Sequence, residues 1–289
     1  MSLVSSKEGR GEIPCGAVQQ KLVDTHFQVH VSQWRDVYEE AHVDGAIYRK
    51  RLEVVLHWID DLAMSAGEKV LEIGCGGGRC TVAMAQRGYL VQAIDSVAGM
   101  VDSTQERVRQ AGVSSSASVG LGDAHDLAFP DGAFRLVVAL GVIPYLHSPQ
   151  KAFREMARVL RPGGVLLITA GNRWRLNEVL DPWLSPPMQP ATRAARAILR
   201  RFRKPGLEQF GLPLRLDSVR DLKDWLSAAG LVKMKMTTVG FPPLTFYGRP
   251  IFGERISIRL NDWLQRLADR NVPGVKWGGM DYIVLARKV

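Results

Sequence analysis

The sequence predicts an α/β fold in which helices cover both faces of a mostly parallel sheet. Short apolar runs alternate with helical patterns from residue 69 onwards, which is typical of strands joined by crossover helices. The first apolar run leads into the glycine cluster Gly74, Gly76 and Gly78, where the backbone can turn sharply beneath a ligand. With 289 residues, of which 46% are hydrophobic, the chain can enclose a sizeable core.

The segment before this sheet divides into a leader and a helical region. Residues 1–25 begin with a polar stretch broken by glycine and proline, so we expect a flexible leader without the apolar core of a signal peptide. A helical pattern dominates residues 26–66, where we expect an N-terminal helical cap with a break at Gly45. Trp34 and Tyr38 are candidates either for a lid over a cofactor or for packing of this cap onto the core.

The alternation of elements is regular up to Gly171. Strands are predicted over residues 69–75, 90–95, 117–123, 134–141 and 165–170. The helices between them are predicted over residues 79–87, 97–110 and 150–160. Because crossovers between parallel strands are right-handed, the carboxyl ends of these strands should meet at one edge of the sheet, where ligands bind.

The regular pattern stops after Gly171. Proline-rich and aromatic stretches at about 171–216 and 241–280 predict two substrate-cap insertions within a single domain over residues 67–289. The remaining elements are helices over residues 218–229 and 254–268 and strands over residues 233–240 and 281–289. Alternation therefore resumes in the C-terminal third.

A basic amphipathic helix is predicted inside the first insertion, over residues 191–204, from Ala191 to Lys204. Apolar side chains fill one arc of this helix and arginines the opposite one, so it could contact an anionic membrane surface, an acidic carrier or only solvent. The formal net charge of +9 also admits nucleic acid as a partner. No apolar run is long enough for a transmembrane segment, and the 3 cysteines without a CxxC pair indicate a reducing, cytoplasmic setting.

The glycine loop discriminates between two classes of cofactor. Its G-x-G-x-G spacing lacks the third glycine that a dinucleotide requires, because Arg79 stands at that position. S-adenosylmethionine carries no phosphate and needs only a tight turn against its amino-acid and ribose portions. Glu72, just before the loop, could orient the loop or meet the ammonium group of this cofactor.

Acidic residues also end the second and third predicted strands. Asp95 could accept both ribose hydroxyls, and Asp123 could accept the adenine amine while the Ala124 amide faces a ring nitrogen. Met100 could pack on the adenine face. Each aspartate alone could equally be a helix or turn cap, but their order and spacing favour a nucleoside site.

These pieces resemble class I S-adenosylmethionine-dependent methyltransferases, in particular the small-molecule branch that includes ubiquinone and menaquinone biosynthesis enzymes. The resemblance rests on residues 70–78, 90–95, 122–138 and 155–169. It implies a Rossmann-like sheet of seven strands whose last strand is antiparallel. It also implies cofactor contacts at Glu72, Gly74, Gly76, Asp95, Asp123, Ala124, Leu140 and Gly141.

The methyl acceptor should lie beside the residues that follow the fourth strand. Tyr145 could line its pocket, and His147 is a candidate general base or, alternatively, a helix-start cap. We expect His125 to be a loop histidine at the edge of the cofactor site. Nucleic-acid amino-methyltransferases place a polar residue at the position of Val142, so an amine of a nucleic-acid base is disfavoured.

We therefore expect S-adenosylmethionine-dependent methyl transfer, without a metal, to an oxygen or carbon of a small, lipid-like or amphipathic metabolite. Nitrogen is a less favoured acceptor atom. Two alternatives remain open on the sequence: a nucleic-acid methyltransferase, and a module that binds S-adenosylmethionine without catalysis.

Overall fold

The computed structural model describes residues 16–182, 184–185 and 215–289. The first part of the expected leader and the basic segment from Ala191 to Lys204 lie outside these residues. Most of the first expected insertion also falls outside them.

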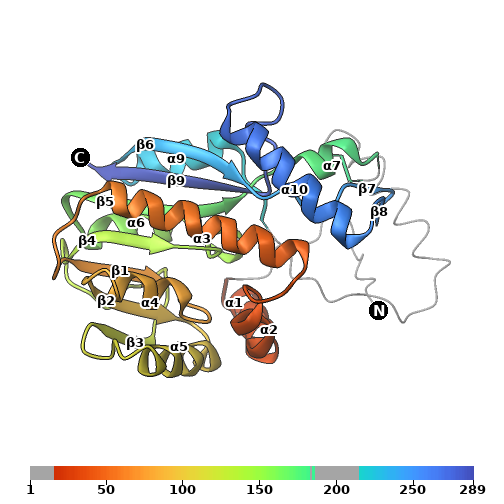
Figure 1. The fold of residues 1–289 in the computed structure, drawn as a ribbon. Coiled ribbons are helices and arrows are strands. Elements are labelled where there is room, and N and C mark those ends of the chain that lie inside the picture. Colours follow the sequence, from red (N-terminus) through yellow and green to blue (C-terminus); the bar gives the residue numbers. More distant parts are fainter. Residues whose placement is uncertain (1–15, 183, 186–214) are drawn as a thin grey trace, which may run out of the picture.

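A seven-stranded sheet forms the centre of the molecule (Figure 1). From one edge to the other its strands are β3 (Ala117–Leu121), β2 (Leu90–Asp95), β1 (Lys69–Ile73), β4 (Phe134–Ala139), β5 (Leu160–Gly171), β9 (Asp281–Lys288) and β6 (Leu231–Val239). The pairs from β3 to β5 are parallel, whereas β9 runs antiparallel to both of its neighbours. The predicted fold class, including the antiparallel last strand, is confirmed.

The central strands are mostly apolar because both of their faces are buried. In β1, Leu71 and Ile73 join one core cluster, whereas Val70 joins the other. Helices α6 (Pro149–Val159) and α9 (Val219–Ala228) contribute to the first cluster, and α3 (Val43–Asp61) and α4 (Arg79–Ala85) contribute to the second. Helix α5 (Ala98–Gln110) packs beside β3 and α4.

The predicted bounds of most elements hold to within about two residues, but β5 begins earlier than expected. Leu160 already pairs with Phe134, and a register shift follows before Leu136 pairs with Val165. The Pro-Gly-Gly sequence at 162–164 therefore lies inside β5 as an irregularity. The sequence had predicted a strand that begins only at residue 165.

Smaller elements surround the carboxyl edge of the sheet. These are η1 (Ile143–Tyr145), α7 (Leu176–Leu180), β7 (Thr245–Phe246), β8 (Arg249–Pro250) and α10 (Glu254–Asp269). Helix α10 packs against α3, and its Leu264 and Ala268 bury Phe241 in a small separate cluster. That these segments cap a substrate remains a prediction.

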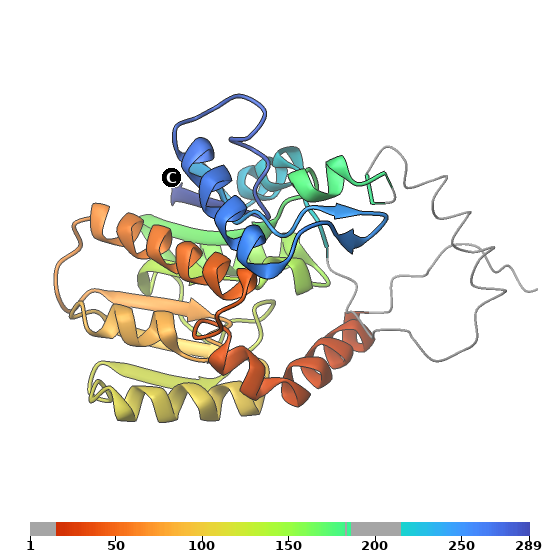
Figure 2. The same cartoon turned by 45° about the vertical axis from the view of Figure 1, so that its right-hand side comes forward.

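The N-terminal region is helical over a longer stretch than expected. Helix α1 (Gly16–Val29) begins inside the segment expected to be a leader up to residue 25, so that expectation is corrected from Gly16 onwards. Helix α2 (Val31–Asp36) follows. The helical structure is interrupted between α2 and α3, and Gly45, where the break was expected, lies inside α3. Figure 2 shows α1 and α2 lying across the end of the sheet at which the parallel strands finish.

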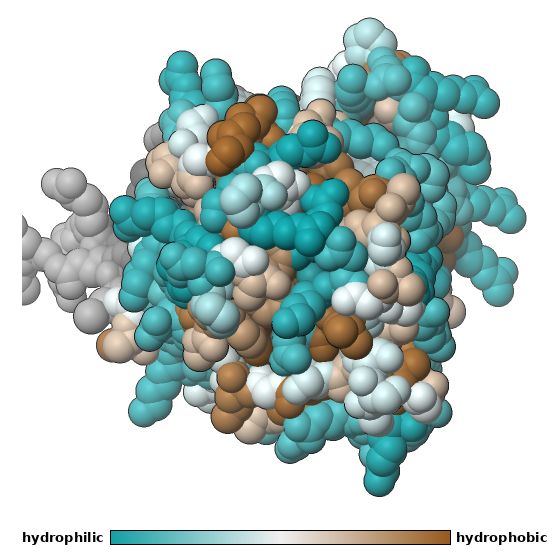
Figure 3. Space-filling model, turned by 90° about the vertical axis from the view of Figure 1, so that its left-hand side faces the viewer, coloured by the Kyte–Doolittle hydropathy of each residue, from teal (hydrophilic) through white to brown (hydrophobic). Residues whose placement is uncertain are grey.

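The end of the molecule at which the parallel strands begin has a mainly hydrophilic surface (Figure 3). Figure 3 shows the side on which the parallel strands begin, where hydrophilic side chains cover most of the surface and hydrophobic ones are scattered among them. Across the described ranges, no helix is both long and apolar enough to cross a membrane.

Asp217 offers a test of how burial affects stability. It is 2% exposed, its Oδ2 atom has no hydrogen-bond partner, and burial raises its pKa to about 7 although Arg215 opposes the rise. An aspartate in an unfolded chain has a pKa of about 3.9, so the folded state loses stability as the pH rises from about 4 to about 7. We expect Asp217→Asn to raise the free energy of unfolding at pH 8 by on the order of 1–3 kcal/mol, as measured by urea titration.

The same variant should have little effect at pH 4, where the native carboxyl group is already neutral. An equal change at both pH values would show that the ionisation of Asp217 is not the cause.

Candidate active site

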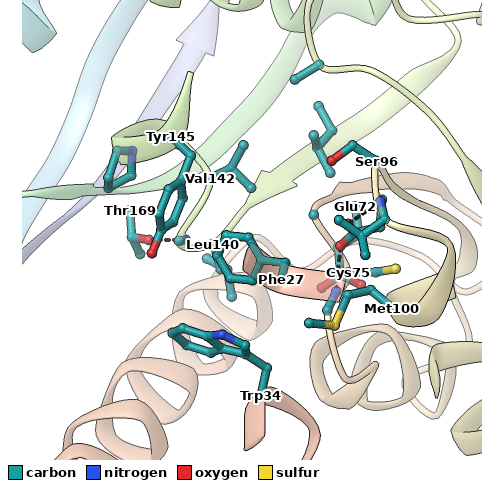
Figure 4. Close-up of a pocket in the computed structure, with 18 of the residues that line it drawn as sticks. Phe27, Trp34, Glu72, Cys75, Ser96, Met100, Leu140, Val142, Tyr145 and Thr169 are labelled. Atoms are coloured by element: carbon teal, nitrogen blue, oxygen red, sulfur yellow. Dashed lines mark hydrogen bonds between the residues drawn. The ribbon is translucent and has the colours of Figure 1, made fainter. Parts of the chain in front are cut away.

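A cavity of about 270 Å³ opens at the carboxyl ends of β1, β2, β4 and β5. Helices α1 and α2 form one of its walls. Figure 4 shows Phe27, Trp34 and Tyr145 toward one end of this space and Glu72, Cys75 and Met100 toward the other. The cavity thus joins the glycine loop to an aromatic region. It matches the edge at which parallel sheets bind ligands.

The glycine loop is held in place by backbone hydrogen bonds. The amides of Gly74 and Cys75 both donate to the Ile94 carbonyl, at 2.7 and 3.1 Å. Gly74 and Gly76 have φ angles of +72° and +52°, which glycine adopts without strain. Bare peptide groups of the loop consequently line the cavity.

The next two loop residues connect it to helices. Gly78 lines the cavity and, with φ of +77°, precedes α4. A Cβ on Gly77 would lie 3.0 Å from the Cα of Arg35, so this glycine lets α2 approach the loop closely. Thr104 from α5 donates its hydroxyl to the Gly76 carbonyl at 2.7 Å. The loop is thereby fixed from several sides.

Asp95, the last residue of β2, holds the glycine loop that follows β1. Its Oδ2 atom accepts from the Gly76 amide at 3.0 Å and its Oδ1 atom from the Val97 amide at 3.1 Å. Burial raises the pKa of Asp95, and these hydrogen bonds offset only part of the rise. Because a carboxylate oxygen can accept more than one hydrogen bond, both oxygens can still receive hydroxyl donors from a ligand.

Glu72 is buried beneath the loop and accepts a hydrogen bond from the Thr81 hydroxyl. Burial raises its pKa to about 7, because the loss of hydration outweighs the hydrogen bonds from Thr81 and Cys80. Glu72 also lines the cavity. Its firmest contact ties β1 to α4, which supports the predicted role in orienting the loop.

Asp123 and Ala124 line the cavity after β3, as the sequence analysis expected. The Asp123 Oδ1 atom accepts from the backbone amide and the ring Nδ1 of His125, at 2.8 and 2.7 Å. Burial pushes the pKa of Asp123 up, but the His125 hydrogen bonds outweigh it and the net pKa is lowered. His125 therefore orients the aspartate, which explains why this histidine is only 2% exposed.

The remaining predicted cofactor contacts also reach the cavity. Met100 is buried in its wall, and Leu140 and Gly141 form the part that follows β4. The Gly141 amide donates to the Thr169 hydroxyl at 2.7 Å, which connects the ends of β4 and β5. All of these contacts are thus brought into a single cavity.

The two candidate catalytic residues are placed differently. Tyr145 lines the cavity, and its ring meets Phe27 edge-on with centroids 4.9 Å apart. His147 is not among the lining residues. It stacks on His125 at 3.7 Å, and its Nδ1 atom is buried without a hydrogen-bond partner. The geometry does not support His147 as a general base within the cavity.

Aromatic side chains from three elements build the far end of the cavity. Trp34 lies 5.4 Å from Phe27 and 5.9 Å from Tyr48, measured between ring centroids, and Tyr38 lies 5.9 Å from Tyr48. Trp34 and Tyr38 both line the space and both pack on Tyr48, and that they form a lid over a cofactor stays a prediction. Such a wall suits an apolar, planar ligand.

Three of the charged residues that line the cavity come from separate parts of the chain and were not anticipated from the sequence. Arg51 comes from α3, Asp281 opens β9, and Arg175 precedes α7. Arg51 is buried although it carries a charge. No local pattern marks these residues, because only the folded sheet and cap bring them together.

Comparison with known proteins agrees with this geometry. A family profile described as a methyltransferase domain matches residues 71–168. The chain is similar to this family over these residues, which make up about a third of its length. The matched segment runs from β1 to β5 and includes the glycine loop, Asp95 and Asp123.

Curated relatives with sequence similarity to this chain match only part of it. Methyltransferase GfsG of Streptomyces halstedii is 36% identical over 108 residues, which is 37% of this chain and 39% of that protein. A ubiquinone biosynthesis O-methyltransferase of Pseudomonas fluorescens is 33% identical over 118 residues, which is 41% of this chain and 50% of that protein. The chain therefore spans half the length of these relatives or less.

Solved structures extend the likeness of the fold to almost the whole chain. Magnesium protoporphyrin IX methyltransferase from Synechocystis PCC 6803 aligns with a TM-score of 0.63 at 14% identity, covering 94% of this chain and all (100%) of that one. The [4+2]-cyclase SpnF aligns with a TM-score of 0.59 at 20% identity, covering 93% and 95%. At these identities the likeness shows the fold alone.

Proposed function

We propose that this protein transfers a methyl group from S-adenosylmethionine to a small organic acceptor. The observation that carries the proposal is Asp95, which lines the cavity together with Asp123. Its Oδ2 atom accepts from Gly76 of the glycine loop, and its Oδ1 atom accepts from the Val97 amide. This arrangement fits a nucleoside with free ribose hydroxyls. The loop offers bare peptide groups rather than the G-x-G-x-x-G arrangement that receives a pyrophosphate.

Each part of the cofactor would have its own partner in this proposal. Asp95 would accept the ribose hydroxyls, Asp123 with the Ala124 amide would receive the adenine edge, and Met100 would cover the adenine face. The loop from Gly74 to Gly78 would surround the amino-acid portion. When bound, the sulfonium supplies an already activated methyl group.

The chain's own task is then to position the acceptor and to exclude water. Phe27, Trp34 and Tyr145 would hold an apolar acceptor against the end of β4, with its nucleophilic atom in line with the methyl group. An aromatic wall contributed by separate helices also keeps the reacting atoms dry. Oxygen or carbon is the proposed acceptor atom, in a small or amphipathic metabolite.

Two relatives bear on the rival functions. The relative named an O-methyltransferase supports an oxygen acceptor. The structural neighbour named a [4+2]-cyclase has a similar fold, so methyl transfer itself must be measured. A nucleic-acid acceptor gains no support, because Val142 packs against Gly74 at the position where a polar anchor would be needed.

Other predictions about the setting of the protein stay predictions. Cys75 and Cys80 are free and buried, which is compatible with the reducing cytoplasm proposed from the sequence. Contact of the segment from Ala191 to Lys204 with an anionic surface or an acidic carrier is likewise proposed from its sequence alone.

The proposed function can be tested in two steps. Isothermal calorimetry should show binding of S-adenosylmethionine to the purified protein. Incubation with methyl-labelled S-adenosylmethionine and a metabolite extract of the source organism should then yield a labelled product that mass spectrometry finds one methyl group heavier. Absence of binding would reject the proposal, and binding without any labelled product would favour the non-catalytic alternative.

A further inference from the structure

A buried ion pair lies at the aromatic end of the cavity. Arg51 and Asp281 are 7% and 9% exposed, and the Arg51 Nη1 atom lies 3.4 Å from the Asp281 Oδ2 atom. The two residues are far apart in the sequence and come from α3 and β9. Both line the cavity.

This pair is poorly explained as a device for stability. Burying two charges costs more than a long, single contact returns, and a distance of 3.4 Å is long for an ion pair. The Arg51 Nε atom is buried and has no hydrogen-bond partner. The arginine is instead held by Asp281 and by the Tyr48 ring, whose centroid lies 4.4 Å from its Cζ atom.

The position of the pair is next to the expected site of methyl transfer. Asp281 pairs with Gly171 at the end of β5. A Cβ on Gly141, at the end of β4, would lie 3.5 Å from the Arg51 Nη1 atom. The carboxylate and the guanidinium therefore sit beside the strand ends that the cofactor contacts were predicted to reach.

Other titratable groups near this end are less suited to accept a proton. Burial raises the pKa of Tyr145 to about 12, so this phenol stays neutral and cannot act as a base at neutral pH. His147 does not line the cavity, and its ring stacks on that of His125. Glu72 is engaged with Thr81 beneath the glycine loop.

We propose that Asp281 accepts the proton of an acceptor hydroxyl during methyl transfer and that Arg51 is a positioning residue that orients the carboxylate. This inference rests on the proposed function. The acceptor oxygen forms a bond to the methyl carbon while the bond from that carbon to sulfur breaks. The hydroxyl proton passes to the Asp281 carboxylate and later to water, and the electron pair of the broken bond stays on sulfur in the neutral thioether product.

The surroundings also specify the class of acceptor. Phe27, Trp34, Tyr48 and Tyr145 supply flat apolar surfaces around the pair, so the acceptor class is a hydroxylated aromatic compound. Arg51 beside the acceptor oxygen would stabilise the negative charge that develops there as the proton leaves. A protonated amine would instead meet the like charge of Arg51.

The charges that face Asp281 come from several elements. Burial raises its pKa, which makes it a stronger proton acceptor, and Arg51 of α3 and Arg175 before α7 partly oppose this rise. Tyr48 of α3 and Tyr145 of η1 also lie within its electrostatic reach. The activity should therefore rise with pH through the ionisation of Asp281 and then reach a plateau.

The test compares the wild type with Asp281→Asn on a panel of substituted phenols of graded acidity, with methyl-labelled S-adenosylmethionine. We expect O-methylated products from the wild type. Asp281→Asn should reduce kcat by at least about a hundredfold, with a much smaller effect on KM, and should lose the rising limb of the pH profile. The loss should be smaller for phenols that are already ionised at the assay pH, because they need no base.

Further variants separate a role in proton transfer from a role in folding. Asp281→Glu keeps a carboxylate and should recover part of the activity. Asp217→Asn removes a similarly buried carboxyl group that does not line the cavity, and it should keep wild-type activity. Thermal unfolding and calorimetry with S-adenosylmethionine should show that Asp281→Asn is folded and binds the cofactor within about threefold of the wild type.

The outcomes distinguish the two proposals. A wild type that does not bind S-adenosylmethionine would overturn the proposed function and this inference with it. Binding without an O-methylated phenol, or transfer to carbon or nitrogen, would overturn the inference alone. So would an Asp281→Asn variant that keeps activity within about threefold of the wild type on the least acidic phenols.

Discussion

Replacing Asp95 with alanine is expected to weaken the binding of S-adenosylmethionine at least about tenfold, and up to a few hundredfold. The substitution removes the proposed acceptor of the ribose hydroxyls. It also frees the Gly76 and Val97 amides, which now donate to this carboxylate. The loop therefore loses both a ligand contact and part of its own support. Isothermal calorimetry would measure the change in affinity.

Asp102→Ala is a matched control, because Asp102 is an exposed aspartate on the nearby α5 that does not line the cavity. Asp95→Asn adds a second comparison, since it keeps one acceptor oxygen and should lose less affinity than alanine. Unchanged affinity in Asp95→Ala would contradict the role assigned to this carboxylate in the proposed function.

Replacing Gly74 with alanine is expected to destabilise the protein by about 3 kcal/mol. Alanine would be strained at the φ angle of +72°, and its Cβ would lie only 2.4 Å from the Val142 Cγ2 atom. Either the loop or the segment after β4 must then move. Urea unfolding would measure the loss of stability, and cofactor affinity should fall as well.

Two further variants separate the effect of the positive φ angle at Gly74 from that of the clash with Val142. Gly76→Ala also has a positive φ, but no atom lies within 4 Å of its Cβ, so it should cost only about 1 kcal/mol of stability. Val142→Ala removes the clashing methyl group and should recover part of the loss when it is combined with Gly74→Ala, in a double-mutant cycle. Equal costs for the two glycine substitutions would mean that the contact with Val142 is unimportant.

The fold between β1 and β5 was predictable because local signals agree with the tertiary structure there. Buried parallel strands are continuous apolar runs, and glycines or polar residues mark where each strand ends. Residues 90–95 were predicted as a strand with the bounds that β2 has. The start of β5 was missed because Leu160 already pairs with Phe134 ahead of the Pro-Gly-Gly sequence, which by itself indicates a turn.

The cofactor side of the cavity was predictable for a related reason. Asp95 and Asp123 follow strands, and the ends of parallel strands must share an edge. The aromatic end of the cavity was not predictable. Arg51 and Phe27 lie on helices, and the periodicity of a helix does not show where it packs against the sheet. His147 was weighed as a general base or a helix-start cap, and the sequence alone does not show that its ring stacks on His125.

The position of β9 has a consequence for the synthesis of the protein. This strand lies between β5 and β6, although both precede it in the chain. Until residues 281–288 have left the ribosome, β6 has no neighbouring strand in the sheet and Arg51 has no carboxylate opposite it. A nascent chain can therefore assemble its glycine loop early, but the aromatic end of the cavity is completed only after translation has reached β9.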